Sequence, residues 1–138
     1  MMKKSNKILK NNKGITGIDL TIGLIVLALF SGVITMLMSY TYKASLEIQK
    51  GANAMAYATM VLEKVDEKSY EEVNEAFVTY LENLGEIELS DQYVINFSAK
   101  ELSKDLFKKV EITVNYDFFG EQKSLAINKL KIKELEEW

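Results

Sequence analysis

The sequence predicts an α+β protein in which a long N-terminal helix packs on a small three-stranded antiparallel sheet, with one short extra helix. Three observations predict this fold. Residues 20–42 are uncharged and are followed by a segment with helical spacing of apolar residues. A capping-box pattern opens a second helical segment at Ser69. From Tyr93 onward, apolar and polar residues alternate with the period of a β-strand.

The composition excludes several classes of site. The 138 residues include no Cys, no His and no Pro, and all 17 basic residues are Lys. Disulfides, thiolate or imidazole metal ligands, and Ser-His-Asp or Cys-His triads are therefore excluded. The acids are scattered or stand beside lysines, as in Glu63-Lys64, which is typical of a solvated surface. We expect no enzyme activity, no cofactor and no metal site, although a Ca²⁺ site of loop carboxylates such as Asp91 is left open because no spacing places one.

Charge is divided along the chain. Residues 1–14 hold five lysines and no acid, so the remainder of a chain with net charge −3 carries −8. A basic N-terminus before an apolar run favours a cytoplasmic N-terminus and an extracytoplasmic C-terminal part. The body is acidic and has no Arg, so we predict no direct contact with nucleic acid.

The apolar run at 20–42 is long enough to cross a membrane. As a helix, its 23 residues span about 35 Å, against a hydrocarbon core of about 30 Å. A buried core helix is a weaker alternative, because so small a domain cannot surround a helix that is apolar on every side. A cleaved secretory signal is also weaker, because the run is long and no small-x-small exit follows it. Ala28 and Gly32 stand four residues apart and predict a place where another helix packs closely.

The junction before the apolar run is the most specific signal. It reads KGITGID over residues 13–19. A carboxylate one turn into a spanning segment costs on the order of several kcal/mol unless it is protonated, reaches the interface or meets a cation. Asp19 therefore predicts a partner of opposite charge.

This string, with its basic leader and the apolar run after it, resembles the class III signal peptide of type IV pilins and of the pseudopilins of type II secretion and competence systems. The resemblance implies that a membrane prepilin peptidase cuts the Gly14–Ile15 bond and N-methylates Ile15. It implies that Asp19 of an incoming subunit pairs with the new amine of its neighbour and sets the register of a filament. It also implies a pilin-like fold.

The string differs from the common family pattern at three places, where Ile15 stands for Phe, Gly17 for a large apolar residue and Asp19 for Glu. It is also similar to the N-termini of some archaeal flagellins. The partners that the resemblance implies are the prepilin peptidase, other pilin or pseudopilin subunits, a membrane platform protein and, before assembly, the lipid bilayer. The implied location is a single pass through the cytoplasmic membrane, followed by a cell-surface filament after assembly.

The chain divides into four parts on this interpretation. They are a removed leader (1–14), a transmembrane and assembly helix (15–42), an amphipathic continuation of that helix (43–65) and an extracytoplasmic α+β head (66–138). The helix is predicted to run from residue 17 to about Lys64, because no Pro interrupts it. Its second half has one apolar stripe, which we expect to cover the sheet: Ile48, Ala52, Met55, Thr59 and Leu62.

A short second helix is predicted after Ser69. Ser69 and Glu72 form the S-x-x-E pattern of a capping box, and Gly85 supplies a left-handed stop. The apolar residues at helical spacing are expected in the core: Tyr70, Val73, Phe77, Tyr80, Leu81 and Leu84.

Three strands are predicted after this helix. The first starts at Tyr93 and ends before a polar connection, 98–106. The second is 109–118, followed by a turn at 119–121. In the third, the alternation shifts near 128–129, which predicts a β-bulge there. The apolar residues expected on the inner face are Tyr93, Ile95, Phe97, Val110, Ile112, Val114, Tyr116, Phe118, Leu125, Ile127, Leu130 and Ile132.

The sequence therefore predicts a structural subunit, a minor pilin or pseudopilin, of a type IV pilus-like, type II secretion or competence filament. The alternative is a single-pass, membrane-anchored extracytoplasmic binding protein that does not polymerise. The choice among pilus, secretion and competence systems, and the cargo, stay open.

Overall fold

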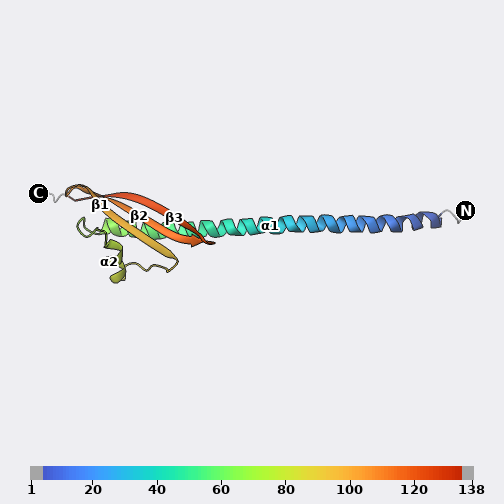
Figure 1. The fold of residues 1–138 in the computed structure, drawn as a ribbon, viewed down its shortest axis with the longest axis horizontal. Coiled ribbons are helices and arrows are strands. Elements are labelled where there is room, and N and C mark those ends of the chain that lie inside the picture. The colour runs from blue at the N-terminus through green and yellow to red at the C-terminus, as the bar shows by residue number, and fades with distance from the viewer. Residues whose placement is uncertain (1–4, 135–138) are drawn as a thin grey trace. The chain divides into compact units, whose positions relative to one another are not determined.

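The structure is a computed structural model that describes residues 5–134, with side chains described from Thr16 onward. The chain forms two compact units, Met1–Ser45 and Leu46–Trp138, and we call the second unit the head. The predicted α+β fold is confirmed. The elements are α1 (Ser5–Glu67), α2 (Phe77–Asn83), β1 (Tyr93–Ser103), β2 (Phe107–Phe118) and β3 (Glu121–Ile132) (Figure 1).

Helix α1 is a single helix, as predicted, and it is longer than predicted at both ends. It begins at Ser5 and ends at Glu67. No Pro interrupts this stretch of the sequence, so every residue can contribute its backbone N–H to the helical ladder. Lys64 lies in the last turn, where a cation interacts favourably with the helix dipole.

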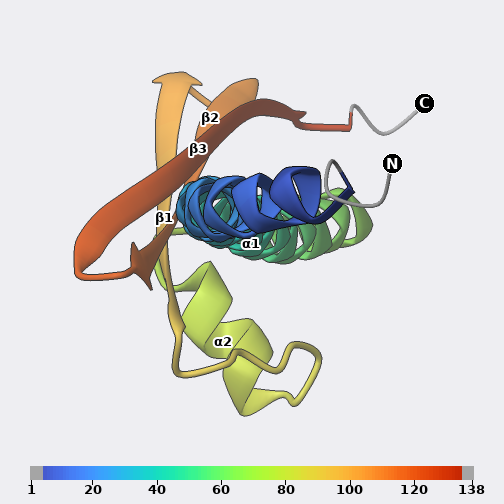
Figure 2. The ribbon, with the colours of Figure 1, turned by 90° about the vertical axis from the view of Figure 1, so that its right-hand side faces the viewer.

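The three strands form an antiparallel meander in the order β1-β2-β3. The inward residues of the central strand β2 are buried, as predicted: Val110, Ile112, Val114 and Phe118. Strand β1 is longer than predicted, because residues 98–103 continue the strand instead of forming a connection. Figure 2 shows the sheet curving past α1, with α2 near β1.

The head core lies between the sheet and one face of α1, but that face is not the predicted one. Ile48 and Met55 are 73% and 50% exposed, and Leu62 is only partly buried. The buried residues of α1 are Ala54, Ala58, Val61 and Val65. Small side chains bring the helix backbone close to the aromatic rings of the sheet, so that a Cβ atom added at Gly51 would lie 3.6 Å from the Tyr116 hydroxyl oxygen. The predicted stripe has the right helical period but lies on another face of α1, because two faces of this part of the helix repeat with that period.

The predicted β-bulge at residues 128–129 is absent. Pairing between β2 and β3 is continuous from Phe107–Ile132 to Phe118–Glu121. The inward positions that the bulge would have given to Leu130 and Ile132 belong instead to Lys129 and Lys131. Both lysines reach the end of α1, where Lys129 pairs with the Asp66 carboxylate and Lys131 Nζ donates to the Asp66 carbonyl oxygen at 3.3 Å. Leu130 and Ile132 are consequently exposed, and the described sheet has its register shift between Glu101 and Ser103 of β1 instead.

Helix α2 is shorter than predicted, because residues 70–76 form turns. Half of the predicted capping box forms, since the Glu72 carboxylate accepts hydrogen bonds from the backbone N–H and the hydroxyl of Ser69, both at 2.9 Å. The carbonyl oxygens of Tyr70 and Val73 instead accept hydrogen bonds from Lys108 Nζ, at 2.8 Å and 3.1 Å. The backbone N–H of Phe77 donates to the Asn74 carbonyl oxygen, at 3.0 Å. In a continuous helix the N–H of Phe77 would donate to the Val73 carbonyl oxygen, four residues earlier.

The end of α2 follows the prediction. Gly85 has a φ of 68°, its N–H donates to the carbonyl oxygen of Glu82, and the N–H of Glu86 donates to that of Leu81. These two hydrogen bonds form the Schellman motif expected of a glycine stop. Of the predicted core residues of this segment, Tyr80 and Leu84 are exposed, and the following four are buried: Tyr70, Val73, Phe77 and Leu81.

The face of α1 that packs on the sheet can be tested with one pair of variants. Ala58→Leu adds three carbons to a fully buried position and should lower the free energy of unfolding of the head by about 1–3 kcal/mol. Ala52→Leu makes the same change at an exposed position of the predicted stripe and should change it by less than about 0.5 kcal/mol. Thermal unfolding of the full chain in detergent, followed by near-ultraviolet circular dichroism, measures both. A larger loss of stability for Ala52→Leu than for Ala58→Leu would show that the predicted stripe, and not the Ala54–Ala58 face, packs on the sheet.

Candidate functional site

The apolar part of α1 is exposed on every side in the first unit. From Ile18 to Tyr42 the large apolar side chains are between 44% and 68% exposed. Among the described residues, one helix is long and apolar enough to cross a membrane. A helix surface that is apolar all round is stable only against lipid or against other apolar chains.

Four hydroxyl groups of this segment are satisfied within the helix. Each donates to the carbonyl oxygen four residues earlier, at 2.8–2.9 Å: Thr21, Ser31, Thr35 and Thr41. In a hydrocarbon environment an unsatisfied hydroxyl would be costly, and these back-bonds remove that cost. These four positions therefore present no unsatisfied hydroxyl group to lipid.

Asp19 is the exception. It is the only charged residue between Lys13 and Lys43, and its side chain is exposed. Within the described range 16–134, no cation pairs with its carboxylate. Because a helix turns by about 100° per residue, Asp19 lies about 180° from Ala28 around the helix axis. Asp19 and the Ala28–Gly32 pair therefore lie on opposite faces of α1.

The Ala28–Gly32 pair belongs to a longer stripe that sequence analysis missed. At about 100° per residue, other small or hydroxyl residues lie within about 60° of Ala28 around the axis. They are Gly17, Thr21, Ser31, Thr35 and Ser39. No heavy atom lies within 4 Å of a Cβ added at Gly17 or Gly32, so this face has space for a neighbour's side chains. The helical period of the small residues was the signal available in the sequence.

The predicted cleavage site lies at the edge of what the structure describes. Gly14 and Ile15 belong to α1, but their side chains lie outside the described residues. Cleavage between them and methylation of Ile15 stay predictions, as does the role of Asp19.

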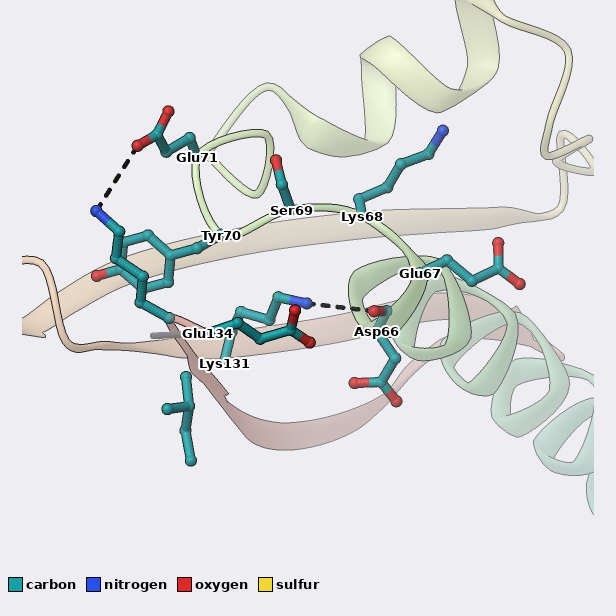
Figure 3. Close-up of a pocket in the computed structure, with 10 residues that line it drawn as sticks. Asp66, Glu67, Lys68, Ser69, Tyr70, Glu71, Lys131 and Glu134 are labelled. Atoms are coloured by element: carbon teal, nitrogen blue, oxygen red, sulfur yellow. Dashed lines mark hydrogen bonds and ion pairs between the residues drawn. The ribbon is translucent and has the colours of Figure 1, made fainter. Parts of the chain in front are cut away.

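In the head, a pocket of about 370 Å³ lies where the end of α1 meets the end of β3 (Figure 3). The polar groups that line it contact one another. The Lys131 ammonium donates to the Asp66 carbonyl oxygen, and the Lys133 ammonium lies 3.7 Å from the Glu71 carboxylate. Among the described residues, no group of three Asp or Glu side chains is placed to hold a metal ion. The lining pairs are contacts that join α1, the 68–71 segment and β3.

A second polar cluster fixes the segment between the helices to the sheet. The Tyr70 hydroxyl donates to the Glu101 carboxylate at 3.0 Å, and the Lys108 ammonium lies 4.1 Å from the centre of the Tyr70 ring. Burial of Tyr70 raises the pKa of its hydroxyl, and the Glu101 contact adds to this effect. The backbone N–H of Asp105, followed by the Tyr70 hydroxyl, lowers the pKa of Glu101.

A groove of about 450 Å³ lies between α2 and β1. Its lining includes apolar side chains, such as Val78 and Phe97, and three acids, Glu75, Glu82 and Asp91. The surrounding segment, residues 69–99, has seven acids and no lysine. The groove therefore suits an extended chain that carries both apolar and basic groups.

The carboxylates of the head make its stability sensitive to acid. Hydrogen bonds from Ser69 lower the pKa of Glu72, and the Lys68 ammonium lowers that of Glu86. A carboxyl that is more acidic in the folded state stabilises the head fully above its unfolded pKa of about 4.3, and this stabilisation is lost as the pH falls through the lower folded value. The thermal midpoint should therefore be flat from about pH 6 to 9 and fall below about pH 5, because the chain has no His.

The Glu86 contribution has a matched control. Glu86→Gln should reduce the difference in thermal midpoint between pH 7 and pH 3, because the ion pair with Lys68 at 2.8 Å is lost. Glu88→Gln, at an exposed position two residues away, should leave that difference unchanged. Equal pH profiles for wild type and Glu86→Gln would contradict the assignment.

No protein-family model, curated protein or solved structure matches the sequence or the structure. What is established is a long apolar N-terminal helix of a length able to span a membrane, joined to a head in which the end of that helix packs on a small antiparallel sheet. This arrangement is compatible with a pilin-like architecture.

Proposed function

We propose that the chain is a structural subunit of a membrane-assembled filament of the type IV pilin or pseudopilin kind, used as a minor pilin or pseudopilin. The observation that carries the proposal is Asp19, an exposed carboxylate with no cation among the described side chains, at the start of the part of α1 that is apolar on every side. In lipid this group is costly, so it favours a state in which another chain supplies a positive charge.

Cleavage at Gly14–Ile15 would supply that charge. Before cleavage the Ile15 nitrogen is a neutral amide, and afterwards it is an amine with an unperturbed pKa near 8, which is protonated at neutral pH. The amine and Asp19 of neighbouring copies would then pair at a fixed height along the filament. The five lysines before the cut would stay in the cytoplasm, as the charge rule for membrane insertion requires.

The apolar helix supports assembly energetically. Its transfer from lipid into a bundle of like helices exchanges one apolar surface for another, so the hydrophobic effect opposes the transfer little. The small-residue stripe around Ala28 and Gly32 favours close approach on one face, while Asp19 lies on the opposite face. Contacts on two opposite faces suit a bundle with neighbours on both sides.

A second function is favoured by the groove between α2 and β1. A single-pass protein that displays this acidic groove outside the membrane would bind a basic or apolar extended segment without polymerising. Such a protein would keep its basic leader, because no free amine is needed. Processing therefore separates the two functions.

Coexpression with a prepilin peptidase should remove residues 1–14 and leave a 124-residue chain that begins with N-methylated Ile15. Intact mass and N-terminal sequencing of protein extracted from membranes measure this. Gly14→Leu is the control, because a bulky side chain before the scissile bond should block the cut. A stable wild-type protein that retains its leader would contradict the filament proposal and favour the anchored binding protein.

Asp19→Ala should leave membrane insertion and leader removal intact while lowering incorporation into sheared filaments by roughly tenfold or more, the loss expected from about 1.4 kcal/mol of pairing energy. Asp19→Glu keeps the charge and should retain most incorporation. Quantitative immunoblotting of tagged subunits in the filament fraction provides the measurement. Normal incorporation of Asp19→Ala would show that the register does not depend on this carboxylate.

A further inference from the structure

The groove between α2 and β1 combines an apolar lining with acids that the head leaves uncompensated. Val78 and Phe97 belong to the apolar lining. Glu75, Glu82 and Asp91 line the same groove, and none of these three carboxylates forms an ion pair within residues 16–134. The groove therefore presents negative charge beside apolar surface.

The opposite charge surrounds an apolar patch at one end of the outer face of the sheet. Phe107 of β2 lies directly opposite Ile132 of β3, and Lys109 lies opposite Leu130. Phe107, Leu130 and Ile132 are 36%, 55% and 67% exposed. On the β1 side, Lys100 is the cross-strand partner of Lys109. We call these five residues the basic patch.

The basic patch contributes little to the stability of the head. Like charges directly opposite each other, as at Lys100 and Lys109, destabilise a sheet. The Lys109 ammonium lies 3.4 Å from the Glu111 carboxylate on its own strand, at an exposed position where such a pair adds little. Exposed apolar side chains that lie together and are rimmed by charge are typical of an interaction surface.

The groove and the basic patch complement each other within one sequence. Residues 69–99, which include the acids of the groove, carry seven acids and no lysine. Residues 100–109 and 129–133, which include the patch, carry seven lysines and two acids. Opposite charges of this kind steer two surfaces together and orient them. The groove and the patch share no residue, so occupying one leaves the other accessible.

We propose that the groove of one head binds the basic patch of the head of a second copy. Apolar side chains of the patch would cover the apolar lining, and its lysines would meet the acids that have no partner in their own head. Because the two surfaces differ, the contact is head-to-tail: each pair keeps one unused groove and one unused patch, so the contact can repeat. The role of this contact in a filament rests on the proposed function, whereas the contact itself needs only two heads.

Single cysteines test the contact cleanly, because the chain has none of its own. The full chain with Gly14→Leu, which keeps the leader, is reconstituted in vesicles as a mixture of Thr79→Cys, at an exposed position in the groove, and Leu130→Cys, in the patch. A short bis-maleimide should join these two variants at least about threefold more than Thr79→Cys and Ser124→Cys, because a held contact raises the effective concentration of the thiols. Ser124 is the matched control, since it is exposed and lies on the same face of β3, roughly 20 Å from Leu130.

The cross-linked products separate the outcomes. Equal yields for Leu130→Cys and Ser124→Cys would overturn the contact, and leader removal from the wild type would still leave the filament proposal standing. Conversely, a cross-link between heads whose wild-type chain retains its leader in cells would support the contact and contradict the filament. The double variant Thr79→Cys/Leu130→Cys should give products larger than a dimer, and a product that stops at the dimer would overturn the repeating arrangement. A cross-link in cell membranes from Thr79→Cys to a different protein, with none to Leu130→Cys, would overturn the assignment to a second copy.

A charge exchange tests the complementarity itself. Lys100→Glu with Lys109→Glu, in the Leu130→Cys chain, should lower the cross-linking yield with Thr79→Cys roughly tenfold, because acids would then face acids. Glu82→Lys with Asp91→Lys, in the Thr79→Cys chain, should restore most of the yield with this reversed patch. An unchanged yield after the first reversal, or no recovery after the second, would overturn the pairing of these two surfaces.

Discussion

The head depends on how closely one face of α1 approaches the sheet. Gly51, Ala54 and Ala58 are small, so the backbone of the helix lies near the inner side chains of β2, and Val61 and Val65 extend the same contact toward the end of the helix. The three strands present an apolar inner face, and this helix is what covers it. The larger residues Ile48 and Met55 on the neighbouring face would hold the two layers further apart. The same helix also carries the apolar segment, so one continuous element contributes both to the head core and to that segment.

The chain has no Arg and no His, and lysine ammonium groups make many of the polar contacts between distant parts of the head. Lys129 and Lys131 of β3 reach Asp66 at the end of α1 and join the sheet to the helix. Lys108 holds the segment after α1 by two backbone carbonyl groups and by the ring of Tyr70. Each contact joins parts of the chain that are more than 30 residues apart. The long side chain of lysine suits this role, because its stem packs along apolar surface while its ammonium reaches a distant acceptor.

The existence and type of each element followed from periodicity, whereas the tertiary details did not. The strands, the turn at Phe119 and the glycine stop at Gly85 were predictable because alternation and special backbone angles are local properties. The buried face of α1 was not, since choosing Ala54 and Ala58 over Ile48 and Met55 requires knowledge of the aromatic side chains they meet. The supposed bulge failed for the same reason: the alternation of β3 places Lys129 and Lys131 inward, and only the position of Asp66 makes that favourable. In the apolar segment Asp19 could be identified by its charge alone, and the stripe that extends beyond Ala28 and Gly32 was missed although its helical period can be read from the sequence.

The hydrogen bonds from Lys108 to the carbonyl groups of Tyr70 and Val73 lie in a segment whose sequence favours a helix. Residues 69–84 have the local pattern of one helix of about four turns, and in the newly made chain nothing opposes that helix until β2 exists, more than 20 residues later. In the folded head, Lys108 contacts two carbonyl groups of this segment, and residues 70–76 lie outside α2. The local sequence pattern and the native long-range contacts therefore favour different conformations here, and a conflict of this kind counts against fast folding.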